Sequence, residues 1–389
     1  MKIPILIIAL VQCTSAWAIS IDSIPATAGK KHGLHFIQNA RSANIAQGLL
    51  LTPFLVPGYS PDIQFTLTAG GIISFKTLKK DSLLPRSSVP ATITYSSTGA
   101  FIASSNWVTF WLHDRLRVNC LLQYRSLKDV YFGVGYANAI QTSYPDSTGY
   151  HRSYFVFQVR PLWRLGSSFF AGAFLDYNQN ILWDVNPHMA KDPNYRQFGQ
   201  NIINAGVGGS ITFDSRDFPQ NAYKGFYLSA TYTVYGKTMG ANTRFRTLDV
   251  DSRLYIPLSP HKIRTLAFNW RSRYEFGQTP FTAMASFGSP FDLRGYRYGQ
   301  FRDQFSNYGI LEYRHKLYFG NNQPSRYGFV LWTALGAIGP EFYQSLFCNS
   351  LPNAGIGLRF EIQPRLNVRL DVGYSPSHSG VYFNFPEAF

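Results

Sequence analysis

The chain has 389 residues and a formal net charge of +15 at pH 7, with 16% aromatic but only 15% charged residues. Because soluble globular proteins contain about 25% charged residues, this composition disfavours an ordinary soluble domain. The mean hydropathy of −0.11 is too polar for a helical membrane protein, and a lipid-facing wall around a wet interior accounts for both values.

The first residues have the pattern of a secretory signal peptide. A basic residue precedes an apolar stretch from Ile3 to Val11, and a small-x-small cleavage motif ends at Ala18. We therefore predict a signal peptide over residues 1–18 and export from the cytoplasm. A lipoprotein signal at Cys13 is the alternative, although the residue before this cysteine is larger than such a signal prefers.

Residues 19–61 are marked by glycines and prolines, and we predict that they form a periplasmic leader ahead of a barrel over residues 62–389. No run of about 18 apolar residues follows the signal peptide, so no membrane-spanning helix is expected. Two cysteines remain after export, Cys120 in a predicted strand and Cys348 in a predicted loop. Two cysteines at unknown separation predict neither a disulfide nor a metal site.

Alternation of apolar and polar residues is the main structural signal, and it is clearest near the end of the chain. In Ile356–Gln363 the even-numbered residues are apolar and the odd-numbered residues are polar or glycine, and Leu366–Ser375 repeats the alternation. Successive side chains of a β-strand point to opposite faces, so each strand has one oily and one wet face. The same pattern recurs upstream in residues 226–234, 248–256, 266–276 and 311–317.

These strands predict an all-β fold, a transmembrane antiparallel β-barrel in the outer membrane of a Gram-negative bacterium. No helical segment is predicted to cover the oily faces, and an open sheet edge in lipid would cost several kcal/mol per backbone group, so the sheet must close. The pattern gives about 14 strands from Ile63 onward, and a further pair within residues 44–60 and 88–112 brings the number to about 16. Tight turns such as Pro257–Lys262 alternate with long polar connections, and residues 277–306 are predicted to form a long extracellular loop.

A polar turn joins two of these strands within Ile211–Leu228. Its proline and glycine shape a tight turn on the periplasmic side, and its acidic and basic residues can neutralise one another at the strand end. A turn with no further role is the alternative interpretation. This hairpin motif comprises Asp214, Arg216, Asp217, Pro219, Lys224 and Gly225.

The long predicted loop contains the triplet Arg294-Gly295-Tyr296, and the strand after it carries Glu312 and Arg314 on one face. A glycine permits close approach of two backbones, a tyrosine offers a flat packing face, and an arginine forms a bidentate pair with a carboxylate. Arg294 can therefore form a bidentate pair with a carboxylate, and Gly295 and Tyr296 can pack closely against another surface. The alternative is a solvated loop in which the triplet occurs by chance.

The last segment of the chain alternates as well. Val381, Phe383, Phe385 and Phe389 keep one parity, and the sequence ends on an aromatic residue. A terminal aromatic residue after an alternating strand is similar to the signal by which outer-membrane barrels are delivered to their assembly machinery. We therefore predict that Phe383, Phe385 and Phe389 form a C-terminal strand signal.

Together, the hairpin motif, the Arg-Gly-aromatic loop and the Glu-x-Arg strand resemble the barrel of the BamA/TamA family, the bacterial surface antigen family. The resemblance is good over residues 200–389 and extends over residues 60–200 only as a barrel pattern. It implies that the loop, the sixth extracellular loop of the family, folds into the lumen and that Arg294 meets acidic groups on the inner wall. Glu312 is the expected partner, and further candidates are Glu361, Asp371, Asp249 and Asp251.

Two departures from the family pattern bear on function. The family's next strand carries an aspartate where this chain has Ala334, so the loop contact is expected to be weaker or rebuilt around Glu312. Barrels of the family usually follow periplasmic (POTRA) domains that grip client polypeptides, whereas residues 19–61 are too short to form one. We therefore expect a stand-alone barrel of the family, whose function transfers less securely than its fold.

Three functions compete. The resemblance implies an assembly factor that assists insertion or translocation of proteins or lipids at its lateral seam, with the Arg-Gly-Tyr loop folded into the lumen. The alternative is an anion-favouring, porin-like diffusion channel, because inward basic residues outnumber inward acids. A barrel lipase or protease is disfavoured, since the eight histidines are scattered and no nucleophile motif accompanies them. We expect no enzymatic activity, no cofactor and no bound metal.

The expected partners follow from charge and from the missing domains. The net charge of +15 is expected to meet anionic outer-membrane lipids, including lipopolysaccharide, rather than nucleic acid. An assembly role without client-binding domains needs polypeptide clients together with either a separate periplasmic partner or a homo-oligomer.

Overall fold

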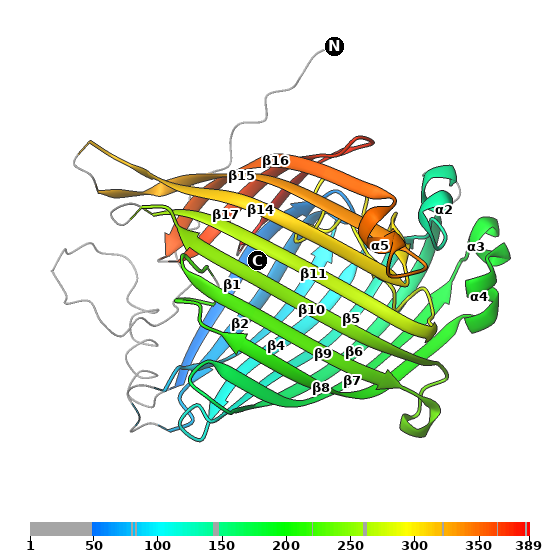
Figure 1. Cartoon of the computed structure of the whole chain (residues 1–389), viewed down its shortest axis with the longest axis horizontal. Coiled ribbons are helices and arrows are strands. Elements are labelled where there is room, and N and C mark those ends of the chain that lie inside the picture. The colour runs from blue at the N-terminus through cyan, green and yellow to red at the C-terminus, as the bar shows by residue number, and fades with distance from the viewer. Residues whose placement is uncertain are drawn as a thin grey trace, which may run out of the picture.

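A computed structural model describes residues 49–78, 81, 84–142, 148–219, 221–259, 263–320, 323–363, 365–385 and 387–389. The predicted signal peptide and the predicted leader up to residue 48 lie outside the described residues. Sixteen strands form one closed antiparallel barrel, in which strands that follow one another along the wall pair side by side (Figure 1). The predicted fold class and the predicted number of about 16 strands are confirmed.

The strands of the barrel are long and tilted (Figure 1). The first nine are β1 Leu49–Ser60, β2 Gln64–Phe75, β3 Ser87–Ser96, β4 Phe101–Trp111, β5 Leu116–Val130, β6 Gly149–Arg164, β7 Phe169–Trp183, β8 Asn201–Asp214 and β9 Gly225–Tyr235. The others are β10 Arg244–Pro257, β11 Arg264–Gln278, β14 Phe305–Tyr318, β15 Pro324–Gly339, β16 Ser350–Gln363, β17 Leu366–Tyr374 and β18 Ser379–Asn384.

The barrel begins earlier than predicted, because β1 belongs to the wall and the predicted boundary at residue 62 moves to Leu49. Pro53 and Pro57 give this segment the composition of a leader. Prolines are tolerated in strands at the edge of a sheet. In β1 all 12 residues pair with β2, whereas among the described residues its register with β18 is the single pair Tyr59 and Phe383.

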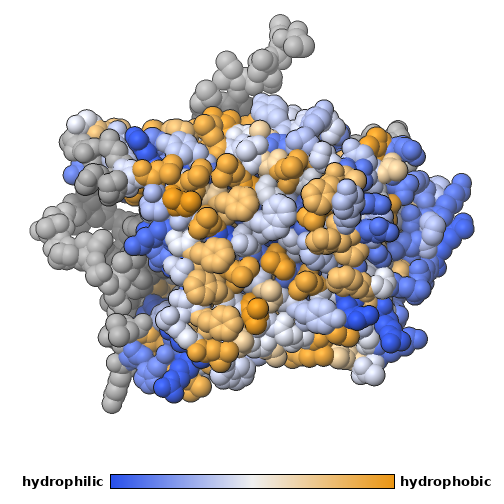
Figure 2. Space-filling view, viewed as in Figure 1, coloured by the Kyte–Doolittle hydropathy of each residue, from blue (hydrophilic) through white to orange (hydrophobic). Residues whose placement is uncertain are grey.

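The predicted alternation of oily and wet faces is confirmed. In β16 the side chains of Ile356 and Leu358 point outward and are 48% and 59% exposed. Arg359, the next residue after Leu358, points inward and is 6% exposed. Apolar side chains cover the middle of the outer wall, and polar ones gather at the end that carries α3 and α4 (Figure 2). The wall therefore presents its oily face to lipid and its polar face to the lumen.

The two ends of the barrel differ. Helices and long connections lie at one end, and short turns lie at the other (Figure 1). Short turns are typical of the periplasmic side of such barrels and long loops of the extracellular side. None of the described helices is long and apolar enough to cross a membrane. The elements of the extracellular end are α2 Tyr136–Gln141, α3 Pro187–Lys191, α4 Pro193–Phe198, the 3-10 helix η1 Lys237–Met239 and α5 Gln344–Phe347.

Candidate functional site

The connection between β11 and β14 folds into the barrel. It contains two short strands, β12 Ala285–Ser286 and β13 Arg302–Asp303, which pair with each other. Its apolar side chains are buried: Phe281 and Leu293 are 0% exposed and Phe301 is 4% exposed. Burial of large apolar side chains is the main force that holds a polar segment of this length inside the lumen.

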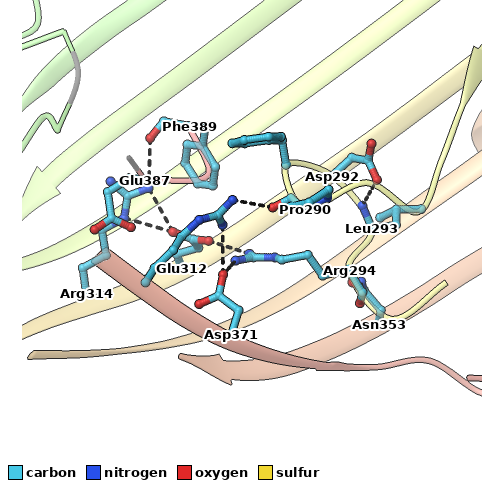
Figure 3. A network of polar contacts seen from close by, with 12 residues as sticks. Pro290, Asp292, Leu293, Arg294, Glu312, Arg314, Asn353, Asp371, Glu387 and Phe389 are labelled. Atoms are coloured by element: carbon cyan, nitrogen blue, oxygen red, sulfur yellow. Dashed lines mark hydrogen bonds and ion pairs between the residues drawn. The ribbon is translucent and has the colours of Figure 1, made fainter. Parts of the chain in front are cut away.

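Arg294 lies at the tip of this loop and is completely buried. Its Nη2 atom lies 2.6 Å from Glu312 Oε1 on β14, and its Nη1 atom lies 2.7 Å from Asp371 Oδ2 on β17. The guanidinium also stands 3.7 Å from the centre of the Trp332 ring on β15. The loop therefore bridges two carboxylates and an aromatic face of the inner wall (Figure 3).

Gly295 lets the loop backbone touch the wall. Its φ of +111° is a conformation that side chains with a Cβ rarely adopt. A Cβ on Gly295 would lie 3.0 Å from backbone atoms of Gly373 and Tyr374, and a Cβ on Gly373 would lie 2.6 Å from the Arg294 carbonyl oxygen. Both glycines are thus needed where the loop meets β17.

Further hydrogen bonds hold the loop tip on two strands, β16 and β18. The Gly295 amide donates to the Tyr382 hydroxyl at 2.9 Å, and the Asn353 side chain donates to the Arg294 carbonyl at 2.5 Å. Tyr296 donates its hydroxyl to the Pro352 carbonyl at 2.8 Å. The predicted triplet therefore contacts β16 and β18 as well as β17.

The ion pairs of Arg294 continue into a larger group, which we name the Arg294 cluster. Asp371 also accepts from Arg359 at 2.6 Å and from Arg369 at 2.9 Å, and Glu312 pairs with Arg314 at 2.9 Å. The cluster brings the predicted residues Arg294, Glu312 and Arg314 together (Figure 3). Its members are Arg294, Glu312, Arg314, Arg359, Arg369, Asp371 and Glu387.

Two neighbours supply the contacts that the family resemblance assigns to an aspartate at the position of Ala334. Ala334 is buried at 6% exposure. Trp332, two residues earlier on the same face of β15, covers the guanidinium of Arg294, and Asp371 supplies the second carboxylate. The other candidate partners pair elsewhere: Glu361 with Lys316, Asp249 with Arg273 and Asp251 with Arg253.

The last described residues, Glu387, Ala388 and Phe389, are buried in the lumen, so Phe389 does not continue the parity of β18, whereas the C-terminal strand signal stays a prediction. Strand β18 stops at Asn384, and the Phe389 side chain is 6% exposed. The Arg314 guanidinium stands 4.8 Å from the centre of the Phe389 ring. Phe383 stays on the strand opposite Tyr59, and its ring lies 6.0 Å from that of Phe385.

Charge explains this inward turn. The Glu387 carboxylate lies 2.8 Å from Arg359 Nε and accepts from Asn367 at 2.7 Å. Burial opposes ionisation of Glu387, but the guanidiniums of Arg359 and Arg314 outweigh it and lower the pKa of this carboxyl to about 2. Alternation along the chain does not reveal an attraction between residues on different strands, so it could not predict the inward position of Glu387 and Phe389.

The hairpin motif lies between β8 and β9 at the periplasmic end. Asp214 and Arg216 pair at 2.9 Å, as expected for neighbours that neutralise each other. Asp217 instead pairs at 2.9 Å with Arg365, which lies in the turn between β16 and β17. Burial raises the pKa of Asp217, whereas hydrogen bonds from the Tyr223 and Lys224 amides lower it. The net effect is a pKa below the ordinary value.

The remaining hairpin residues shape this contact. Arg216 donates to the Pro219 carbonyl at 3.0 Å. Gly225 has φ +112°, and a Cβ there would lie 2.4 Å from the Ser215 carbonyl oxygen. Because β9 and β16 are separated along the wall by β10, β11, β14 and β15, the hairpin reaches across the periplasmic mouth of the barrel.

Both cysteines of the described chain are free, Cys120 buried and Cys348 exposed. No group of three or more histidine, cysteine or acidic side chains positioned for a metal ion occurs within the described residues.

Comparison with protein families decides the identity of this barrel. The model of the Omp85 superfamily domain matches residues 87–384, which is most of the chain. The chain belongs to the Omp85 superfamily. The Omp85 assignment, together with the closed barrel, places the protein in the bacterial outer membrane. No curated protein sequence matches this chain.

Solved structures of Omp85 barrels share the fold. BamA of Haemophilus ducreyi lacking POTRA domains 1–3 is 13% identical with a TM-score of 0.57, covering 87% of this chain and 70% of that one. CdiB of Escherichia coli is 13% identical with a TM-score of 0.58, covering 86% of this chain and 62% of that one. CdiB of Acinetobacter baumannii is 12% identical with a TM-score of 0.56, and the match covers 87% of this chain and 60% of that one. The chain thus spans less than two thirds of either CdiB.

Proposed function

We propose that this Omp85 barrel assists insertion or translocation of polypeptides or lipids at the seam between β1 and β18. The single described register pair between these strands, Tyr59 with Phe383, carries the proposal. By contrast, β10 and β11 pair along the whole of Arg244–Pro257. A strand edge with free backbone groups is a template on which an incoming strand can pair.

The filled lumen supports the same proposal. The Arg294 cluster fixes the loop across the interior, and the Asp217–Arg365 pair ties the hairpin across the periplasmic mouth. A polypeptide would meet less resistance at the seam than in the lumen. We further propose that either a separate periplasmic partner or a second copy of the chain captures the client, and that outer-membrane lipids, including lipopolysaccharide, surround the wall.

A disulfide across the seam tests this proposal. Tyr59→Cys and Phe383→Cys are placed together in a background with Cys120→Ala and Cys348→Ser. Paired residues of antiparallel strands have Cα atoms roughly 4.5–5.5 Å apart, which a disulfide can bridge. In proteoliposomes, the reduced protein is expected to speed the folding of a urea-denatured eight-stranded barrel, and the oxidised protein is expected to lose this effect.

The matched control places a disulfide between two strands that already pair along their length. Val372→Cys and Val381→Cys form a register pair between β17 and β18, and their disulfide should leave the activity unchanged. Equal activity of the oxidised Tyr59–Phe383 variant and its reduced form would contradict the proposal.

An anion-favouring diffusion channel is the second candidate. Arg160 and Arg271 line an internal cavity, and neither forms an ion pair with a described carboxylate. Such unpaired cations favour passage of anions. Single-channel conductance of the intact barrel separates the two functions, because a filled lumen conducts little.

A further inference from the structure

Strand β10 carries two arginines on the outer side of the barrel, at its extracellular end. Arg244 and Arg246 are exposed, whereas Phe245 between them points inward and is 3% exposed. Leu254 and Ile256 have the same parity as the two arginines and are 39% and 43% exposed, as expected for side chains that face lipid. Both guanidiniums therefore project from the lipid-facing side of the wall.

Their height along the strand places these arginines at the edge of the membrane. From Leu248 to Ile256 the outward positions of β10 are apolar except for Ser252. This stretch is about as long as the roughly 9–11 residues with which a tilted strand crosses a bilayer. Arg246 and then Arg244 follow directly above it, at the level of the lipid headgroups. An outward arginine is costly at the middle of a bilayer and costs little at this level.

The two arginines have no carboxylate beside them. The carboxylates of β10 and β11 point into the lumen, where they pair with Arg253 and Arg273. On the outer face, Arg246 lies between Val234 on β9 and Phe276 on β11, and both of these neighbours are apolar. Neither arginine forms an ion pair with any described residue. The outer face therefore has an uncompensated positive charge at the level of the headgroups.

An aromatic surface begins directly beside Arg246. The rings of Phe276 and Phe305 have their centres 5.5 Å apart, and the ring of Tyr274 lies 5.7 Å from that of Phe305. Tyr274 also lies 5.3 Å from Phe342, which precedes α5 and is 53% exposed. These rings form a continuous apolar surface on the outside of β11 and β14.

Helix α5, at the extracellular end of the wall (Figure 1), extends this surface. The Asn307 side chain on β14 donates to the Ser345 hydroxyl at 2.9 Å and to the Ser345 carbonyl at 3.1 Å. Asn307 has the outward parity of Leu311, so α5 covers the lipid side of this strand. Tyr343 and Phe347 remain 65% and 71% exposed. Large exposed apolar side chains mark a surface that contacts a partner or a membrane, and on this side of the wall they face lipid.

Cations beside an apolar surface suit a ligand that combines phosphate with hydrocarbon. Guanidiniums bind phosphate through paired N–H donors. Lys237, which is exposed in η1 between β9 and β10, adds a third cation at the same end. A free phosphate ion would leave the aromatic surface unused, and a neutral lipid would leave the cations unused. A phosphorylated lipid uses both, as does the lipid A part of lipopolysaccharide with its phosphates and acyl chains.

We propose that the outer side of β10, β11 and β14 at the extracellular end is a binding site for a phosphorylated lipid of the outer leaflet, namely lipid A. Arg244 and Arg246 hold a phosphate, and Phe276, Phe305 and Phe342 contact the acyl chains. The site rests on the proposed presence of lipopolysaccharide around the wall and names where one molecule is held. It shares no residue with the seam between β1 and β18, so the action at the seam and this site can fail separately.

Native mass spectrometry of the folded full chain in detergent tests the site, with purified diphosphorylated lipid A as the probe. The same lipid without its phosphates, and inorganic phosphate, are compared with it. We expect one lipid A to be retained and to raise the unfolding temperature. The dephosphorylated lipid should be retained more weakly, and inorganic phosphate should leave the unfolding temperature unchanged.

Substitutions place the binding on the outer face. Arg244→Gln and Arg246→Gln should each weaken retention of lipid A about tenfold, because each removes a charge-assisted hydrogen bond to the phosphate. Phe342→Ala should weaken retention of lipid A and of the dephosphorylated lipid alike, since both have acyl chains. Arg196→Gln, in the exposed helix α4 at the same end, is the matched control and should leave retention unchanged. Heat-modifiable mobility of each variant verifies that it folds.

Several results would overturn the proposal. Equal retention of lipid A and of the dephosphorylated lipid by the unsubstituted protein would remove the role of the phosphate. Equal weakening by Arg246→Gln and Arg196→Gln would indicate a general effect of charge. A rise of the unfolding temperature with inorganic phosphate as large as with lipid A would assign the cations to a free anion. Loss of the seam activity with lipid A still retained would contradict the proposed function alone.

Discussion

At the scale of single residues, Arg294 links parts of the barrel that are far apart in the chain. Its guanidinium joins the loop to Glu312 on β14 and Asp371 on β17 while Trp332 covers its face. Asp371 in turn meets three arginines. A buried charge of this kind is stable only while its partners remain, so each member of the Arg294 cluster depends on the others.

Replacing Arg294 should therefore be more harmful than replacing an exposed arginine. Arg294→Ala leaves two buried carboxylates short of a partner, which is expected to cost about 3–5 kcal/mol of stability. The loss is measured as a lower unfolding temperature in heat-modifiable mobility. Arg196→Ala in the exposed helix α4 is the control, and equal unfolding temperatures of the two variants would speak against the role of Arg294.

Gly295 provides a steric test of the same contact. Gly295→Ala puts a Cβ into a backbone conformation of φ +111° and within 3.0 Å of the β17 backbone. The strained backbone alone is expected to cost about 1–3 kcal/mol. Gly236→Ala is the control, since a Cβ there meets no atom within 4 Å. Protease cleavage of the loop should increase in the Gly295 variant only.

At the scale of elements, the loop between β11 and β14 is a second packing unit inside the wall. Its ribbon of β12 and β13 carries Asp303, which is 4% exposed. Burial raises the pKa of Asp303 to about 6, although the Gln304 amide opposes the shift. The loop therefore carries a carboxyl group that is easier to bury when protonated.

This carboxyl makes loop docking depend on pH. Between its ordinary pKa of 3.8 and about 6, Asp303 binds more protons in the docked loop than in the undocked loop. Its contribution favours docking at low pH and is lost as the pH rises through this window. Asp303→Asn should raise the unfolding temperature relative to the unsubstituted protein at pH 7 and have little effect at pH 4. A constant difference at both pH values would contradict this prediction.

The elements also show what sequence reasoning can reach. Alternation predicted the wall, because it is a local pattern. The resemblance to the BamA/TamA family implied that Arg294 meets Glu312. The inward position of Glu387 and Phe389 depends on Arg359 and Arg314, which lie on other strands, so parity along the chain could not show it. A strand within residues 44–60 was expected only as part of a further pair, because Pro53 and Pro57 weaken the strand pattern of β1.

At the scale of the whole molecule, segments from both ends fill the barrel. The loop enters from the extracellular side, and Glu387 and Phe389 lie beside it (Figure 3). The two segments share the Arg294 cluster through Arg314 and Arg359. The hairpin between β8 and β9 crosses the periplasmic mouth. We expect a barrel filled in this way to be closed to diffusion, which would leave the weakly paired seam as the route that we propose.

Single-channel conductance in planar bilayers tests this closed state most directly. The intact protein is compared with a variant in which residues 277–306 are shortened to remove Arg294, Gly295 and Tyr296, after heat-modifiable mobility has shown that both fold. We predict that the intact barrel is mostly closed or flickering and that the shortened variant forms a steady pore. A steady, anion-selective pore in the intact protein, unchanged by shortening the loop, would contradict the account and assign the barrel to diffusion.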